Sequence, residues 1–374
     1  MTEEEQILRV CSAFQLRGEY RSYETITYGH INMTYKVYFF RDGEIKDYIL
    51  QRLNTYVFKN PVEVMENTIA VTEYIRKKIK ETGVSAKRYV LHYQRATDGE
   101  YYTRTEDGGF WRCSRFIDDS VSFLRAETPE VMEEAGRAFG EFQLYLSDFP
   151  VEKLHIAIPH FHNTVMRYET FRESIRADAC GRVKDVLPEI DKCLEFEEIA
   201  TKMYKMQRGG ELPLRVTHND TKCSNILFDK DSLRHLSVVD LDTVMPGLVG
   251  FDFGDAIRAG ANTADEDERD IKKVSVDMEK FEAFTRGFIG AVRGSLTANE
   301  KKSMALGALT MTVECGMRFL TDYLDGDKYF HIYHPDHNFV RARCQFALAD
   351  DMIGKMDEMN EIVRKYCEER SQFL

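Results

Sequence analysis

Two neighbouring stretches decide the fold, His218-Asn219-Asp220-Thr221-Lys222-Cys223-Ser224-Asn225 and Val238-Val239-Asp240-Leu241-Asp242. They place an acid at position 220, an amide at 225 and a second acid at 240. Between them, residues 226–228 and 236–239 are typical of two short strands joined by the polar turn 229–232. A loop that leads into such a hairpin, with an acid at the hairpin's end, is expected to bring three oxygen-bearing side chains together.

Oxygen ligands in this order suit a divalent cation beside a reacting hydroxyl group. Mg²⁺ prefers hard oxygen ligands in octahedral geometry, so Asn225 and Asp240 are candidate metal ligands. Asp220 can accept the proton of an attacking hydroxyl, and Lys222 can place a positive charge near a transferred phosphoryl group. The spacing from Asp220 to Asn225 is that of the kinase catalytic loop H-x-D-x-x-x-x-N. The pattern predicts phosphoryl transfer, and the alternative is a polar loop with a helix-capping Asp.

Three further acids follow the hairpin. Asp252-Phe253-Gly254 matches the magnesium triplet of protein kinases, but it lies too far beyond Asn225 to end the hairpin strand. We expect Asp252 and Asp255 to cap the next helix or to brace the catalytic loop from behind. Asp242 faces the same side of an extended chain as Asp240, so it is either a second metal ligand or a structural acid.

The first 115 residues contain a candidate phosphate-covering turn. Residues 23–40 read as two strands around a turn that carries Gly29, His30 and Asn32. Close approach of backbone to phosphate requires such a small turn, although protein kinases place three glycines there and this turn has one. The sequence therefore predicts that Gly29, His30 and Asn32 contact the nucleotide, with a plain hairpin as the alternative.

A cation and a helix acid could complete the nucleotide site. The predicted strand 47–53 carries Arg52 where a kinase places its phosphate-binding Lys, and the alternative is a surface charge. In the predicted helix 61–80, which begins with a proline, Glu66 is the expected ion-pair partner of Arg52, with Glu73 as the second choice. Predicted strands 89–93 and 110–116 lead to a linker in which the backbone of Arg115, Phe116 and Ile117 would bind adenine.

Composition indicates a soluble enzyme. The chain has 374 residues, 43% of them hydrophobic, and a formal net charge of −12, which argues against a general nucleic-acid binder. The acidic start Met1-Thr2-Glu3-Glu4-Glu5 is unlike a signal peptide, and an apolar run long enough to span a membrane is missing. We therefore expect a cytoplasmic protein without a membrane or nucleic-acid partner.

Cysteines and histidines do not predict a metal centre. The eight cysteines are scattered without a C-x-x-C pair, so reduced and mostly buried thiols are expected. His331, His334 and His337 recur every three residues, but Pro335 breaks a helical spacing, and surface or substrate-lining roles are favoured over zinc. The same interpretation applies to the pair that flanks Phe161, namely His160 and His162.

The chain resembles the aminoglycoside phosphotransferase and choline kinase family, and within it most closely the bacterial N-acetylhexosamine 1-kinases. The resemblance rests on blocks that span most of the sequence, at residues 28–32, 50–54, 218–225, 239–247, 252–258 and 314–323. It implies an α+β, two-lobed protein-kinase-like fold. A small antiparallel-sheet lobe (1–115) would bind the nucleotide, and a large, mainly helical lobe (116–374) would carry catalysis and the acceptor.

The same resemblance implies ATP- and Mg²⁺-dependent phosphorylation of the anomeric hydroxyl of N-acetylglucosamine or N-acetylgalactosamine. Asp220 would be the base, and Asn225 and Asp240 would hold magnesium. Thr243, Arg318 and Tyr329 would contact the sugar, with Asp240 close to it. The partners would be ATP and a sugar, and the chain would be a monomer or a weak dimer.

A late helix carries charges at helical spacing. Glu314, Arg318 and Asp322 lie at i, i+4 and i+8, so they share one helix face in an apolar neighbourhood and suggest a polyol site. The alternative is a ladder of intrahelical ion pairs, each worth about 0.2–0.5 kcal/mol. Two other functions stay open: a kinase of the same fold for choline, an aminoglycoside or another sugar, and a catalytically silent nucleotide-binding protein.

Overall fold

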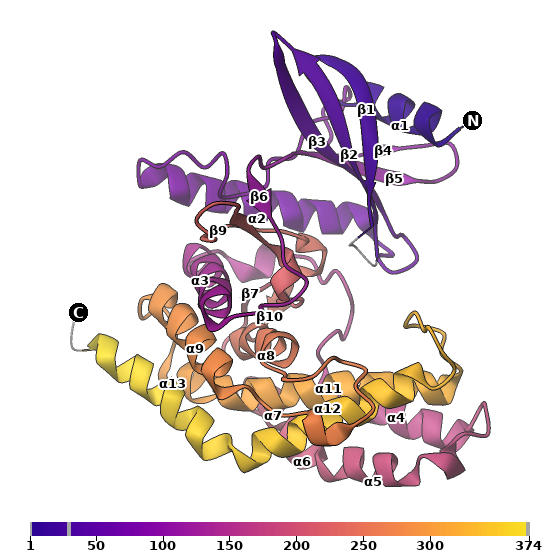
Figure 1. Ribbon diagram of the computed structural model, residues 1–374, viewed down its shortest axis with the longest axis vertical. Helices are drawn as coiled ribbons and strands as arrows, with labels where there is room; N and C mark the ends of the chain where they lie inside the picture. The colour runs from indigo at the N-terminus through magenta and orange to yellow at the C-terminus, as the bar shows by residue number, and fades with distance from the viewer. Residues whose placement is uncertain (1, 28–30, 372–374) are drawn as a thin grey trace.

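The computed structural model describes residues 2–27 and 31–371 and arranges them in two lobes (Figure 1). The small lobe is built on a five-stranded antiparallel sheet with strand order β1-β2-β3-β5-β4. This architecture confirms the expected fold class. The small-lobe elements are α1 (Glu3–Ser12), β1 (Glu19–Ile26), β2 (Met33–Arg41), β3 (Glu44–Leu53), α2 (Pro61–Glu81), β4 (Thr103–Arg104) and β5 (Phe110–Arg115).

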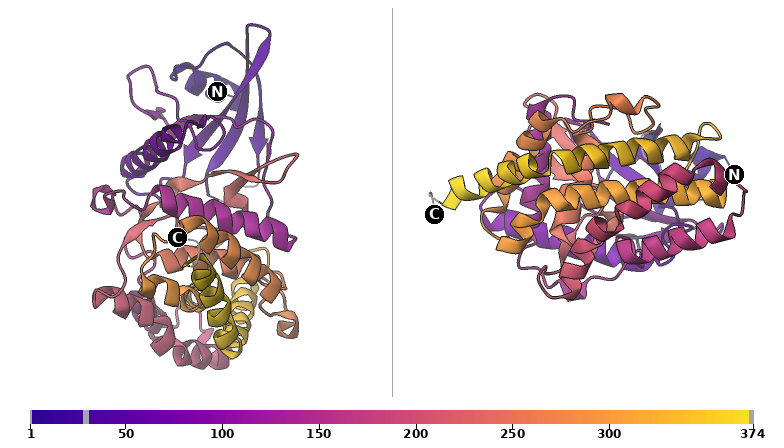
Figure 2. Two further views of the ribbon diagram at one scale, coloured as in Figure 1. Left: turned by 90° about the vertical axis from the view of Figure 1, so that its left-hand side faces the viewer. Right: turned by 90° about the horizontal axis from the view of Figure 1, so that it is seen from below.

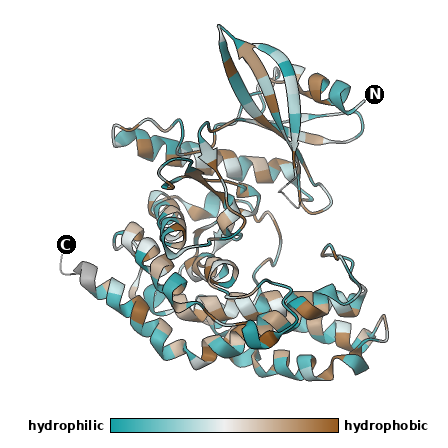
Figure 3. Ribbon diagram, in the orientation of Figure 1, coloured by the Kyte–Doolittle hydropathy of each residue, from teal (hydrophilic) through white to brown (hydrophobic). Residues whose placement is uncertain are grey.

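One face of the sheet is closed by α1. Tyr35 and Val37 of β2, Leu50 of β3 and Trp111 of β5 are buried in one core with Val10 of α1. Because side chains alternate between the faces of a strand, the residues between them point to the large lobe. The strands accordingly alternate between hydrophobic and hydrophilic residues along their length (Figure 3).

Helix α2 connects the small lobe to the large one. Pro61 occupies its first turn, where a missing N–H costs nothing. Its buried stripe of Val71, Ile75 and Ile79 packs with large-lobe residues such as Phe142 and Leu241. Figure 2 shows the helix lying against the large lobe at the base of the sheet.

The large lobe is mainly helical and contains two short sheets, β10-β7 and β6-β8-β9. Its strands are β6 (Ser120–Val121), β7 (Arg215–Thr217), β8 (Ile226–Asp229), β9 (His235–Val238) and β10 (Met245–Gly247). Its α-helices are α3 (Pro129–Tyr145), α4 (Thr164–Ala177), α5 (Leu187–Glu195), α6 (Glu197–Ala200), α7 (Lys202–Arg208), α8 (Val249–Gly260), α9 (Met278–Val292), α10 (Ala298–Lys302), α11 (Met304–Asp325), α12 (His337–Gly354) and α13 (Met356–Ser371). Its 3₁₀ turns are η1 (Val151–Lys153), η2 (Val183–Asp185), η3 (Cys223–Asn225), η4 (Leu241–Thr243) and η5 (Ile271–Lys273).

Small residues allow α8 and α11 to touch along their backbones. A Cβ atom added to Gly254 would lie 2.3 Å from the carbonyl oxygen of Gly307, and one added to Gly307 would lie 2.1 Å from that of Gly250. Any side chain at these positions would force the helices apart. This contact fixes α8, which lies directly behind the catalytic loop.

Two predicted elements differ from the structure. The predicted strand 89–93 is wrong, because only Tyr93 pairs, in a single bridge to Ser114, while Val90 turns into the core beneath α2. Residues 189–208, for which the sequence also predicts one continuous helix, are divided among α5, α6 and α7. The Thr201 hydroxyl at one division donates to the Glu197 carbonyl oxygen at 2.7 Å. As the sequence predicts, most of the cysteines are buried and reduced, namely Cys11, Cys113, Cys193, Cys223 and Cys344. Among the described helices, none has the length and apolar character needed to cross a membrane.

Candidate active site

Backbone hydrogen bonds bring the catalytic loop and the end of the hairpin together. The Val239 N–H donates to the Asn225 carbonyl oxygen at 2.9 Å. The His218 ring, which is fully buried, lies with its Nε2 2.9 Å from the Val239 carbonyl oxygen and with its Nδ1 3.3 Å from the Asp220 amide nitrogen. A neutral ring with its proton on Nε2 satisfies both contacts. His218 therefore joins the segment before Asp220 to the segment before Asp240.

Asp220 is held in its ionised form. Its Oδ2 accepts hydrogen bonds from Lys222 Nζ at 2.9 Å and from Asn225 Nδ2 at 3.0 Å. Burial opposes ionisation, but the Lys222 charge outweighs it and lowers the pKa of Asp220 below its usual value. Because Asn225 uses its nitrogen for Asp220, its amide oxygen is directed to accept a cation or a donor.

Asp240 lies in a cluster of negative charge. Burial, together with the neighbouring carboxylates of Asp242 and Asp220, raises the pKa of Asp240 to about 6. Its backbone is left-handed, with φ 60° and ψ 56°, a conformation unusual for a residue other than glycine. From the described residues its carboxylate receives no hydrogen bond. A bare carboxylate beside two others fits a divalent cation, which would relieve their repulsion.

Two acids at the start of α8 brace the catalytic loop from behind. Asp252 accepts hydrogen bonds from the backbone N–H groups of His218 and Asn219, both at 2.8 Å, and from Gln143 Nε2 at 2.9 Å. Asp255 accepts from the Thr221 N–H at 3.0 Å. The bracing role expected for these acids agrees with this geometry. The capping role is wrong, because α8 begins before Asp252 and has no side-chain cap.

The nucleotide side of the site differs from the expectation. Arg52 lies on the sheet face that packs on α1, where it pairs with Asp107 at 3.1 Å and lies 5.8 Å from the Trp111 ring. Strand alternation therefore turns it away from the cleft, and its assignment to the phosphates is corrected. Glu66 pairs with His155 at 2.7 Å instead of with Arg52.

The alternative acid Glu73 also fails to reach Arg52, because it pairs with Arg76 one helical turn along α2. Two residues of the turn, Gly29 and His30, lie outside the described residues. Asn32 uses its side chain for protein contacts: Nδ2 donates to Asp242 Oδ2 at 2.7 Å, and Oδ1 accepts from the Asn54 N–H at 3.0 Å.

A residue that the sequence did not single out takes the central place on the cleft face. Arg112 of β5 forms an ion pair with Asp242, and the two side chains are only 1% and 2% exposed. Asp242 is therefore a structural acid that is held by the small lobe. The sequence contained a sign of this role, because an arginine within the apolar strand 110–113 requires a buried partner.

The linker after β5 retains a backbone donor. The Arg115 and Phe116 N–H groups donate to the carbonyl oxygens of His92 at 2.8 Å and Asp47 at 3.0 Å. Within the described ranges, the Ile117 N–H has no such partner. Of the three linker residues, Ile117 is therefore the one whose backbone N–H can donate a hydrogen bond to the adenine base.

The late helix α11 forms no ladder of ion pairs. Glu314 is 1% exposed and accepts from Thr164 Oγ1 at 2.7 Å, with His162 Nδ1 at 2.8 Å from its other oxygen. Burial opposes its ionisation, but His162, Arg167 and Thr164 keep the pKa of Glu314 below its usual value. Glu314 is thus an internal acid that orients His162, and its assignment as a direct acceptor contact is corrected.

Asp322 is also committed to the protein. Its two oxygens accept from the backbone N–H groups of Lys328, Tyr329 and Phe330 at 2.8–2.9 Å and from Asn338 Nδ2 at 2.9 Å. Asp322 therefore shapes the loop that carries Tyr329, and its assignment as an acceptor contact is corrected.

Arg318 and Tyr329 come together at the rim of the large lobe. Arg318 Nη2 lies 3.4 Å from the Tyr329 hydroxyl, and its guanidinium lies 5.5 Å from the Phe161 ring. Tyr329 is 59% exposed. Thr243 is 8% exposed, and its hydroxyl donates to the His218 carbonyl oxygen at 2.6 Å, so it serves the catalytic loop.

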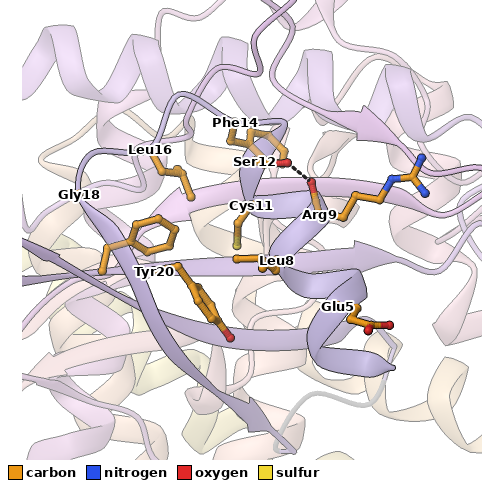
Figure 4. Close-up of a pocket in the computed structure, with 10 residues that line it drawn as sticks. Glu5, Leu8, Arg9, Cys11, Ser12, Phe14, Leu16, Gly18 and Tyr20 are labelled. Carbon is orange, nitrogen blue, oxygen red and sulfur yellow. Dashed lines mark hydrogen bonds between the residues drawn. The ribbon is translucent and has the colours of Figure 1, made fainter. Parts of the chain in front are cut away.

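Two other features lie apart from these residues. A hollow of about 560 Å³ between α1 and β1 is lined mainly by apolar side chains (Figure 4), and it contains none of the catalytic acids. Ligand atoms of Asp267, His334 and His337 lie within 4.8 Å of one another. Both ring nitrogens of His337 are engaged, by Asp267 and by the Tyr333 N–H.

The chain belongs to the phosphotransferase enzyme family (APH), whose sequence pattern matches residues 32–280. This match includes the catalytic loop and the hairpin acid, so phosphoryl transfer is the activity of the class. The use of ATP and Mg²⁺ expected from the sequence agrees with this family.

Solved structures share the whole fold at low sequence identity. A microcompartment-associated aminopropanol kinase has a TM-score of 0.63 and 12% identity, covering 95% of this chain and 98% of its own. An aminoglycoside phosphotransferase from Alicyclobacillus acidocaldarius has 0.61 and 11%, covering 97% and 96%. A spectinomycin phosphotransferase in complex with ADP and spectinomycin has 0.52 and 11%, covering 99% of both chains.

Proposed function

We propose that the chain is an ATP- and Mg²⁺-dependent sugar kinase that phosphorylates the anomeric hydroxyl of N-acetylhexosamines. Asp220 accepts the hydroxyl proton while the γ-phosphoryl group moves in line. Asn225 and Asp240 hold magnesium, which neutralises the phosphates. Lys222, 2.9 Å from Asp220, keeps that carboxylate ionised and lies where negative charge develops.

The choice of acceptor rests on the charge of the residues around the expected acceptor site. Arg318 and Arg167 approach the same region of α11 and α4, and in the described part of the chain neither forms an ion pair with a carboxylate. The two nearby acids are already committed to protein contacts, Glu314 to His162 and Thr164, and Asp322 to backbone amides. The positive side chains therefore disfavour an ammonium group and favour the oxygens of a neutral polyol.

Two of the structural relatives are named for acceptors that bear amines, aminopropanol and aminoglycosides. The positive charge near Arg318 disfavours acceptors of that kind in this chain. An N-acetyl group is neutral and offers a carbonyl oxygen to an Arg donor. N-acetylglucosamine and N-acetylgalactosamine are therefore the proposed acceptors. Another neutral sugar is the second candidate, which the same two guanidinium groups support.

Matched acceptors test the proposal directly. N-acetylglucosamine and N-acetylgalactosamine would be compared with glucosamine, galactosamine, choline and ethanolamine in an ATP-consumption assay, with the new ester located by phosphorus NMR. We expect turnover of the acetylated sugars and a phosphate on the anomeric carbon. Preference for the free amines, or an ester at another carbon, would refute the acceptor assignment.

Replacing Asp220 tests the chemistry independently of the acceptor. Asp220→Asn should lower kcat by about 10²–10⁴, the usual contribution of a positioned base. The melting temperature should change little, because the amide keeps the side chain's size. Near-normal turnover in the folded variant would exclude Asp220 as the base.

A further inference from the structure

The cleft face of the sheet has no cation on β3. Gln51 holds the central position there, opposite Thr34 of β2 and Arg112 of β5. Its Nε2 donates to Thr34 Oγ1 at 3.1 Å, and its Oε1 accepts from Arg112 Nε at 2.9 Å. Lys36 of β2 also lies on this face but pairs with Asp47 at 2.9 Å, so the cation that this face offers to the metal acids is Arg112 of β5.

Helix α2 does not supply the acid that would pair with a strand cation. Glu66 bonds His155 and Glu73 bonds Arg76. The helix instead contacts the loop after the hairpin with neutral groups: Asn67 Nδ2 donates to the Val244 carbonyl oxygen at 2.9 Å, and Thr68 Oγ1 lies 3.5 Å from that of Leu241. Lys78–Asp148 and Arg88–Asp229 also join the lobes, but the ion pair next to the metal acids is a different one.

That pair is Arg112 and Asp242. The guanidinium holds Asp242 Oδ1, and Asn32 holds Oδ2 at 2.7 Å, so both oxygens of this large-lobe acid are fixed by the small lobe. Asp240 stands two residues earlier in a left-handed conformation that surrounding contacts must maintain. Fixing Asp242 fixes the turn from which Asp240 projects.

We propose that Arg112 is the positioning residue of the magnesium site. By holding Asp242 against the small lobe, it directs the Asp240 carboxylate toward the cation and keeps Asp242 from becoming a competing ligand. This role rests on the phosphotransferase activity of the family and is independent of which acceptor is used.

Binding of a fluorescent ADP analogue, titrated with Mg²⁺, tests the role without turnover. In Arg112→Met we expect the apparent Mg²⁺ affinity in the nucleotide complex to fall roughly tenfold or more, as for other groups that orient metal ligands. Metal-free binding of the analogue should change little. Arg52→Met, which removes a cation from the opposite face of the same sheet, is the matched control and should titrate like the wild type.

The sign of the effect discriminates between explanations. If Asp242 were a ligand restrained by Arg112, freeing it would leave the Mg²⁺ affinity unchanged or higher, and either result overturns the proposal. Should Arg112→Met not fold, Arg112→Lys replaces it, because it keeps the charge and the Asp242 carboxylate but loses the planar guanidinium that holds that carboxylate. A folded Arg112→Lys variant with a weakened Mg²⁺ response supports the proposal, and a wild-type or stronger response refutes it.

Discussion

Two arginine–aspartate pairs on adjacent strands of the small lobe show how much the face of a sheet decides. Arg112 of β5 and Asp242 are 1% and 2% exposed, between the lobes. Arg52 of β3 and Asp107 are 29% and 46% exposed, on the face covered by α1. The chemistry of the two pairs is the same, but water screens only the second.

The difference teaches that the value of an ion pair depends on where the chain places it. An exposed pair contributes about 0–1 kcal/mol, because solvent and side-chain entropy offset the attraction. Removing one partner from a buried pair costs about 3–5 kcal/mol, because a charge is left without water or a counterion. Four substitutions can test this contrast.

Removing the buried acid should have the largest effect on stability. Asp242→Ala leaves the Arg112 guanidinium uncompensated in the interior, so we expect a loss of about 3–5 kcal/mol in the free energy of unfolding. Urea denaturation followed by circular dichroism measures it. A loss below about 1 kcal/mol, the range of exposed pairs, would remove the contrast between the two sites.

Removing Asp252, which supports the catalytic loop from behind, should have the second-largest effect on stability. Asp252→Ala leaves the buried N–H groups of His218 and Asn219 without an acceptor, at a cost of about 1–3 kcal/mol. Because the loop loses its support, kcat should fall as well. Thermal melts and steady-state kinetics would show this, and an unchanged kcat would mean that the loop holds its shape alone.

An intermediate case is His235 of β9, which contacts two acids of α3. Its Nδ1 lies 2.9 Å from Glu134 and its Nε2 lies 3.2 Å from Glu141. Burial would lower the pKa of His235, but the two carboxylates outweigh it and raise the pKa to about 9. Both ring nitrogens thus donate in the folded protein.

Because the pKa of His235 is higher in the folded protein than its unfolded value of about 6.5, the charged ring stabilises the fold. This contribution is complete at pH values below about 6.5, and it is lost as the pH rises through about 9. Between these limits we expect His235→Asn to remove about 1–2 kcal/mol of pH-dependent stability. Denaturation at pH 6.5 and 9.5 measures it. Parallel pH profiles of variant and wild type would contradict the assignment.

Breaking the exposed pair should have the smallest effect. Arg52→Met should change the free energy of unfolding by less than about 1 kcal/mol and leave the KM for ATP unaltered, because the side chain faces away from the cleft. Kinetics at varied ATP would check it. A KM raised by an order of magnitude would restore the phosphate-binding role first expected for Arg52.

Local spacing predicted the large-lobe half of the site. The acid, amide and second acid, and the strands 226–229 and 235–238 that link them, depend on short-range geometry that the sequence records directly. The fold class followed from the family resemblance that this motif helps to carry. The distance of Asp252 from Asn225 along the chain argued against a magnesium-binding role for the Asp252-Phe253-Gly254 triplet. The structure places Asp252 behind the catalytic loop.

The small-lobe half could not be predicted in the same way. A one-residue difference in strand register exchanges the two faces, so Gln51 and Arg52 cannot be told apart without the packing of α1. Arg112 and Asp242 are separated by 130 positions, and no local pattern joins them. The helix charges Glu314 and Asp322 share a face by spacing, yet His162, which contacts Glu314, is 152 positions away. Asp322 instead accepts from backbone amides of the loop that follows its own helix.

The position of α2 has a mechanical consequence. Its apolar stripe of Val71, Ile75 and Ile79 shares a core with Phe142 and other large-lobe residues. Rotating residues 1–115 away as one block would expose that stripe to water, at about 25 cal/mol for each Å² uncovered. Tilting the sheet alone, with α2 left in place, exposes none of it. Moving the sheet in this way would, however, separate Leu53 and Phe110 from Val64 and Met65 of α2, with which they share a second buried cluster. Helix α2 is therefore held by apolar contacts on both of its sides.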